Sequence, residues 1–248
     1  MTQTPALATV TVTRNVRTGS TLSALTGLAG ALLYLIGALL PGAAPKPDAT
    51  TSEVADFFTD QRSALLTGLT LELLAVGFLI WFLGALYAYL MSSSPPQTAL
   101  GMSMVAAFVA TIAIVAVGTI PSMAIIWSGT PGLGPDLTQF AYDIQTLATY
   151  VASSTTSAIS ILAPSVIVWR TRVLPRWLCA LGAAAIVVNV VELAGLSSRH
   201  GTLAGGYADG LGPLLWIAWF AAASVSLAWR TRPNQAPQAP VPPAALDQ

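Results

Sequence analysis

The chain alternates long apolar stretches with short polar or basic segments. A membrane-spanning helix needs about 20 mainly apolar residues, and six stretches have that length. The predicted spans are residues 21–41, 63–91, 99–127, 147–169, 176–197 and 211–229. The predicted fold class is therefore all-α, a polytopic transmembrane helical bundle. Pro121 interrupts the third stretch, which predicts either a kink or a helix end in the outer membrane interface.

The membrane domain, residues 21–230, is flanked by two segments of different composition. Residues 1–20 are predicted to be a cytoplasmic N-terminal segment. Residues 231–248 are rich in proline and poor in apolar anchors, which is typical of a disordered tail. An alternative concerns the first span, because Arg14, Arg17, the apolar run and "PGAAP" could form a secretory signal cleaved after Ala44. The apolar run of about 20 residues is longer than the 7–15 expected of such a signal.

The distribution of basic residues predicts the orientation of the bundle, since short cytoplasmic loops carry an excess of lysine and arginine. With the N-terminus inside, the cytoplasmic side holds Arg14, Arg17, Arg170, Arg172, Arg176, Arg230 and Arg232. The outer side holds Lys46, Arg62 and Arg199. Tryptophans fall at the expected aromatic belts, namely Trp169, Trp177 and Trp229 inside and Trp127 outside. Both termini are therefore predicted to be cytoplasmic.

Composition narrows the class of protein. Hydrophobic residues make up 54% of the chain and charged residues 8%, against about 25% charged residues in an average soluble domain. The net charge is zero, which gives no basic face for nucleic acid. One cysteine, Cys179, and one histidine, His200, exclude an intrachain disulfide and a multi-thiolate zinc site, so no metal or cofactor is predicted. Arginine predominates over lysine, and alanine, glycine and proline are abundant, which favours a GC-rich bacterial genome.

The first outer loop predicts a short helix of its own. In "TTSEVADFFTD" Thr50 is followed by Glu53 three residues on, the pattern of a capping box. Val54, Phe57 and Phe58 then share one helical face. We interpret this face as a lid packed on the outer end of the bundle; a docking site for a partner is the alternative.

Two predicted spans each carry a carboxylate in the outer half of the membrane. Glu72 lies in "LTLELLAVGFLIWFLGAL", about 15 Å along the helix from Arg62. Glu192 lies in "NVVELAG", with Asn189 on the same helical face. A charged residue in a membrane span must face the bundle, be protonated or reach water. One hypothesis is a proton-binding or cation-binding site of Glu72, Glu192 and Asn189, and the other is an interhelical hydrogen-bonded clamp.

The fourth predicted span carries an unusual run of hydroxyl groups, "SSTTSAIS". Ser153, Thr156, Ser157 and Ser160 share one face of a helix. Such small residues normally permit close helix packing, and their hydroxyls can bond back to the helix. A pore-lining stripe is the alternative. His200 is interpreted as a solvated loop residue and Cys179 as a small apolar one.

Three segments resemble a family of bacterial six-helix membrane proteins classed as a domain of unknown function. In that family an arginine-rich inner loop leads through Leu-Pro-Arg-Trp-Leu into the fifth span, as in "RVLPRWLCALG" here. "GLAGALLYLIGALL" is similar to its opening helix, and "FFTDQRSALLTGLTLELL" to its first outer loop and second span. The resemblance covers about residues 20–230 and implies six spans, without an activity.

Two hypotheses of function follow. The first is a structural or accessory component that acts in the lipid bilayer through contacts with another membrane protein or a second copy of itself. The alternative is a small permease or proton-linked carrier with an outward-facing polar site. The spans contain no Ser/His pair, aspartate pair or phosphate loop, so an enzyme is not predicted. The predicted location is a bacterial cytoplasmic membrane.

Overall fold

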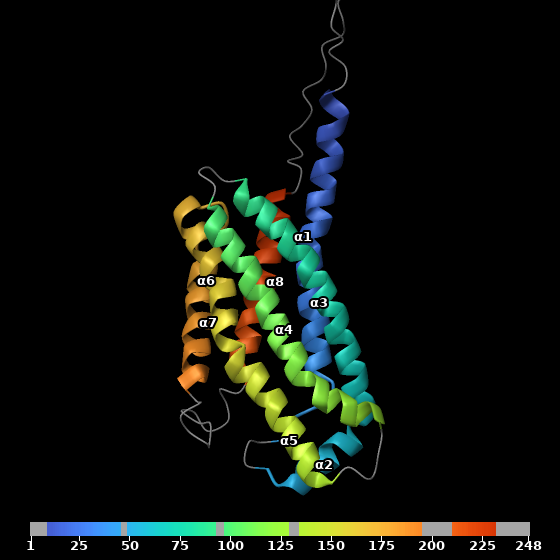
Figure 1. The fold of residues 1–248 in the computed structure, drawn as a ribbon. Helices are drawn as coiled ribbons and strands as arrows, with labels where there is room; N and C mark the ends of the chain where they lie inside the picture. Colours follow the sequence, from blue (N-terminus) through green and yellow to red (C-terminus); the bar gives the residue numbers. More distant parts are fainter. Residues whose placement is uncertain (1–8, 46–48, 93–96, 129–133, 195–209, 232–248) are drawn as a thin grey trace, which may run out of the picture.

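The computed structural model describes residues 9–45, 49–92, 97–128, 134–194 and 210–231; for residues 9–21 and Ala194 it describes the backbone alone. All the elements in these ranges are helices (Figure 1). In chain order they are α1 (Thr9–Leu39), α2 (Thr51–Asp60), α3 (Arg62–Met91), α4 (Thr98–Ser128), α5 (Pro135–Thr146), η1 (Leu147–Ala152), α6 (Ser154–Thr171), α7 (Trp177–Ala194) and α8 (Leu211–Thr231). The polytopic helical bundle predicted from the sequence is confirmed.

Five helical segments are long and apolar enough to cross a membrane. They are Leu22–Leu39, Arg62–Met91, Thr98–Ser128, Pro135–Thr171 and Leu211–Thr231. Helix α7 is apolar but shorter. At about 1.5 Å per residue it falls slightly short of a hydrocarbon core of about 30 Å. It contacts both α6 and α8 at the edge of the bundle (Figure 1). A sixth span stays a prediction.

The fourth apolar segment differs from its prediction. Helices α5, η1 and α6 follow one another without a loop, so the rod begins at Pro135 and not near residue 147. The hydropathy pattern misses α5 because this helix is amphipathic and lies at the end of the bundle. One further boundary differs, since α1 begins at Thr9, twelve residues before its predicted span. Helix α4 matches its predicted bounds within one residue at each end and continues as a helix through Pro121.

Helices α1 and α3 approach so closely that their backbones touch. A Cβ atom placed on Gly68 would lie 2.5 Å from the carbonyl oxygen of Gly37, and one on Gly37 would lie 2.6 Å from the carbonyl oxygen of Gly68. Gly30 similarly faces the backbone oxygen of Ala75. Small residues allow such close approach between membrane helices. This contact fixes α1 against the helix that carries Glu72.

An aromatic cluster fills the centre of the bundle. Phe82, Phe108 and Phe220 are fully buried, and Trp216 and Trp219 pack on Phe220. The rings come from α3, α4 and α8 and meet edge to face or stacked. Aromatic pairs in these orientations each add about 0.5–1.5 kcal/mol beyond the effect of burial. This cluster closes the bundle on the inner side of the cavities described below.

Helices α2 and α5 cover the outer end of the bundle, and we call them the outer lid (Figure 1). Thr50 and Glu53 form the predicted capping box at the start of α2. The Phe58 ring packs edge-on against Tyr142 of α5 at 6.2 Å, and the Tyr142 hydroxyl donates to the carbonyl oxygen of Pro45 at 2.7 Å. Val54 is also buried. The apolar face of α2 therefore packs on the bundle, as the lid interpretation predicts.

The described ends of the chain lie together at the end of the bundle opposite the outer lid (Figure 1). The chain leaves through α8 on the side where α1 begins. Trp169, Trp177 and Trp229 are exposed and lie at the ends of α6, α7 and α8 on this side, and Trp127 is exposed at the end of α4 nearest the lid. This arrangement agrees with the predicted placement of both termini on one side; that this side is cytoplasmic stays a prediction. The predicted tail from residue 232, Arg199 and His200 lie outside the described residues.

Candidate functional site

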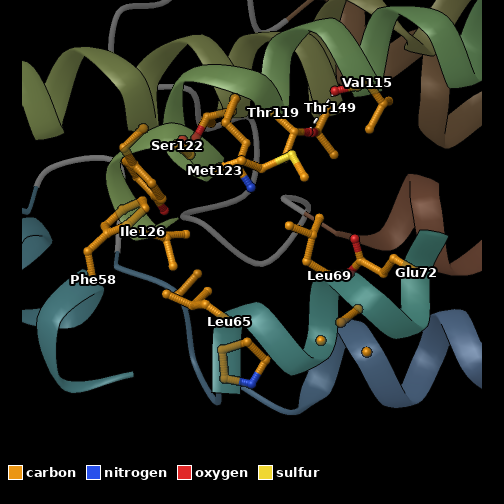
Figure 2. Close-up of a pocket in the computed structure, with 18 of the residues that line it drawn as sticks. Phe58, Leu65, Leu69, Glu72, Val115, Thr119, Ser122, Met123, Ile126 and Thr149 are labelled. Atoms are coloured by element: carbon orange, nitrogen blue, oxygen red, sulfur yellow. Dashed lines mark hydrogen bonds between the residues drawn. The ribbon is translucent and has the colours of Figure 1, made fainter. Parts of the chain in front are cut away.

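Two neighbouring cavities lie inside the bundle. The smaller, of about 220 Å³, runs from the outer lid to Glu72 and is bounded mainly by α1, α3, α4 and the α5–η1 rod. Figure 2 shows its two main walls, with Leu65, Leu69 and Glu72 on α3 facing Thr119 and Met123 on α4. The larger, of about 340 Å³, continues from Glu72 toward α6, α7 and α8. Seven residues line both: Tyr34, Leu69, Glu72, Val115, Thr119, Met123 and Thr149.

Glu72 lies in the wall that the two cavities share. The close contact of Gly37 with Gly68 places α1 directly behind it, so a Cβ atom on Gly37 would lie 3.0 Å from Cγ of Glu72. With α1 blocking that side, the side chain is directed toward α4 and the cavities (Figure 2). The aromatic side chain of Tyr34 lies beside it on the same wall.

Glu72 lacks a countercharge in the described part of the chain. No ion pair or hydrogen bond joins its carboxyl group to another described residue, and the described residues that line the two cavities include no lysine, arginine or histidine. The polar groups near it are hydroxyls, of which Thr119 bonds back to the Val115 carbonyl oxygen at 2.6 Å. A carboxyl group placed this way can accept a proton or a cation from the cavity.

The second predicted carboxylate, Glu192, has a different environment. Its Oε1 accepts a hydrogen bond of 2.9 Å from the backbone N–H of Gly212, in the first turn of α8. An anion is favoured at a helix N-terminus because it satisfies a free N–H and complements the helix dipole. Glu192 lines neither cavity. The structure therefore does not bring the two glutamates together in one site.

Asn189 lines the larger cavity together with Glu72. Its Nδ2 donates to the Ala185 carbonyl oxygen on its own helix at 2.8 Å. Asn189 is 3% exposed. It forms part of the wall of the larger cavity that lies opposite α3. Of the three residues predicted as one polar site, Glu72 and Asn189 share a cavity and Glu192 lies outside it.

The four predicted hydroxyl residues divide between packing and the cavity. Thr156 accepts a hydrogen bond of 2.9 Å from Thr111 on α4, and Ser160 accepts one of 2.9 Å from Nε1 of Trp216 on α8. Both therefore connect helices, as the packing interpretation predicts. Ser153 and Ser157 line the larger cavity.

The structure adds cavity residues that sequence reasoning missed. Tyr34, Thr119 and Thr149 line both cavities, but no spacing or motif in the sequence marks them. The irregular turn η1 is a structural feature that marks this region as a candidate site. In this turn the Ser153 N–H donates to the Ala148 carbonyl oxygen at 3.1 Å, a π-type hydrogen bond that spans five residues. Such turns are frequent at functional sites. Hydropathy patterns do not show them.

The cysteine thiol of the chain lies outside both cavities. Cys179 lies near the inner end of α7, partly buried, with Sγ 3.4 Å from the Ser165 carbonyl oxygen. Among the described residues no three His, Cys, Asp or Glu side chains gather as a metal site would require. No known family, curated protein or solved structure matches the chain. The family resemblance therefore stays a prediction, and function rests on the cavities.

Proposed function

We propose that this protein is a small permease or proton-linked carrier of a bacterial cytoplasmic membrane, with Glu72 as its binding residue. The proposal rests on one observation: a carboxyl group without a countercharge lies where two cavities meet inside the membrane domain. A structural or accessory protein, the first hypothesis from the sequence, needs packed helices but no such space. Because of these cavities, we place the carrier hypothesis ahead of the structural or accessory one.

The cost of placing Glu72 in a membrane span supports this assignment. An ionised acid at the centre of a membrane helix is unfavourable by about 2.5–3.5 kcal/mol on insertion scales, and the cost is smaller toward the interface. Glu72 makes no described hydrogen bond that would offset that cost, whereas Glu192 does. A bound proton or cation removes the charge. The wall opposite Glu72 also offers Asn189, Ser153 and Ser157 for polar contacts with a ligand. We propose a binding and transport role without a cofactor, and no enzymatic step.

The test is whether water reaches the cavity from outside. In a Cys179→Ser background, Thr119→Cys places a thiol on the wall that both cavities share. Val117→Cys is the matched control, because Val117 lies two residues away on α4 and is 67% exposed on the outside of the bundle, where lipid surrounds it. Spheroplasts are treated with a membrane-impermeant maleimide. We expect labelling at position 119 and none at position 117.

A thiol at position 119 that reacts only after denaturation would contradict the proposal. It would mean that the cavities stay dry and that Glu72 is a protonated structural residue. Labelling at position 117 as well would show that the reagent crosses the membrane, and the experiment would then be repeated with a larger reagent.

A further inference from the structure

We infer that the ligand is an organic cation with an apolar body, whose positive group binds Glu72 and whose body occupies the larger cavity. This inference deepens the proposed function and depends on it. It follows from four features: the lining of the larger cavity, the ligands available at Glu72, the charge around the outer end, and the residues at the side of the bundle.

The larger cavity combines one acidic group with a mainly apolar wall. Its volume of about 340 Å³ is at the lower end of the range for small-molecule sites, about 300–1,000 Å³. Most of the lining is aliphatic or aromatic, including Leu79, Ile112 and Trp216. Tyr34 on α1 carries one hydroxyl group beside Glu72, and the other hydroxyl and amide groups lie on α4, on the η1–α6 segment and on α7. An inorganic cation alone would leave this apolar wall without a partner.

The coordination available at Glu72 argues in the same direction. A hard metal ion such as Ca²⁺ takes six to eight oxygen ligands, and Glu72 is the only carboxylate among the described residues that line the cavities. A quaternary ammonium group has no N–H to satisfy, so it can pair with one carboxylate and place its methyl groups against apolar and aromatic side chains. An anionic ligand would meet the Glu72 charge with no basic residue in the described lining to balance it.

Among the described residues, acidic side chains outnumber basic ones at the outer end of the bundle. Five exposed carboxylates lie on the outer lid, two helices that end at the mouth of the smaller cavity: Glu53, Asp56, Asp60, Asp136 and Asp143. Arg62, at the start of α3, is a basic residue at the same end. Its guanidinium donates hydrogen bonds to the carbonyl oxygens of Ile126 and Trp127, at 2.8 and 3.1 Å. A surface whose charges have one sign raises the local concentration of ions of the opposite sign near a cleft. Cations are therefore enriched where the smaller cavity leads to Glu72.

The larger cavity also reaches the side of the bundle. Leu73 on α3 and Ile120 on α4 line it and are 60% and 57% exposed. Both lie on spans, where the surrounding medium is lipid. An amphiphilic cation that has partitioned into the outer leaflet can therefore place its apolar body between α3 and α4 while its positive group faces Glu72.

The experiment measures protection of the thiol at position 119 in the full-length Cys179→Ser, Thr119→Cys protein. Three probes of similar shape are compared: benzyltrimethylammonium, its neutral carbon isostere neopentylbenzene, and benzenesulfonate as an anion. We expect benzyltrimethylammonium to slow labelling and the other two to leave it unchanged. Glu72→Gln should raise the half-protecting concentration about tenfold or more, because the amide removes the negative charge that faces the quaternary ammonium in a poorly hydrated site. Glu72→Asp should keep part of the effect.

Glu192→Gln is the matched control, since it is the same substitution on a glutamate that lines neither cavity. Its half-protecting concentration should stay within about twofold of the parent, because the amide still accepts from Gly212 N–H. Equal protection by the neutral or anionic probe, no protection by the cation, or unchanged protection in Glu72→Gln would overturn the ligand class while the labelled cavity stands. No labelling at position 119 without any probe would instead remove the proposed function, and this inference with it.

Discussion

The contact between Gly37 and Gly68 gives a quantitative prediction about stability. Gly68→Ala places a Cβ atom 2.5 Å from the carbonyl oxygen of Gly37, where ordinary contact begins at 3.4 Å. The backbone of α3 fixes the position of the Cβ atom, and the oxygen belongs to the backbone of α1, so neither atom can rotate away. Helix α1 must retreat from α3 by about 1 Å, and a gap of that size forfeits between a quarter and a half of the dispersion energy of each contact along the seam.

Gly77→Ala is the matched control on the same helix. A Cβ atom on Gly77 meets nothing within 4 Å, so this variant gains the helix propensity of alanine without a clash. Gly68→Ala gains the same propensity, about 1 kcal/mol in water, and the difference between the two variants isolates the steric cost. Overpacking typically costs about 1–3 kcal/mol, and we expect the upper half of that range because two backbones collide.

The assay is reversible unfolding in mixed micelles titrated with sodium dodecyl sulfate, followed by tryptophan fluorescence. Gly68→Ala should unfold at a lower detergent fraction than the parent, and Gly77→Ala at the same or a higher one. Equal unfolding free energies for the two variants, within about 0.5 kcal/mol, would refute the reasoning. That result would show that α1 and α3 separate without cost and that α1 does not hold Glu72 toward the cavities.

Two further predictions concern hydrogen bonds made by glutamates. Glu192→Ala should destabilise the protein by about 1–2 kcal/mol in the same titration, because it leaves Gly212 N–H without its acceptor; a variant as stable as Glu192→Gln would contradict this. The hydrogen bonds from Thr50 hold the pKa of Glu53 below its usual range, so its stabilisation of α2 is complete above the unfolded pKa of about 4.3. That stabilisation is lost as pH falls through the lower folded pKa. Hydrogen exchange of the α2 amides, corrected for intrinsic rates, should therefore accelerate between pH 5 and 3, and Glu53→Gln should abolish this dependence.

Sequence patterns predicted those structural features that depend on residues close together in the chain. The positions of the long spans follow from apolar length, and the capping box at Thr50 and Glu53 forms as its spacing predicts. The face of α2 with Val54 and Phe58 is buried as its periodicity predicts. Each of these features depends on residues close in sequence, and so a single chain is enough to find it.

The site depended on information that one sequence does not carry. Glu72 and Glu192 are equivalent by depth and residue type, yet one faces a cavity and the other accepts from Gly212 of a different helix. Which environment each has is decided by helix rotation and by the neighbours packed around it. Asn189 joins Glu72 only because α7 packs beside α6 and α8. A helix is marked by a periodic pattern in the sequence, whereas a cavity is not.

The unbroken rod of α5, η1 and α6 has a mechanical consequence. Its outer part belongs to the lid, and its inner part presents Ser153 and Ser157 to the larger cavity. No loop separates these parts to absorb a displacement, and they are roughly 30 Å apart at the rise of a helix. We therefore expect a displacement of the cavity wall to be carried along the rod to the lid at the far end of the bundle, and a contact made on the lid to change the shape of the space around Glu72.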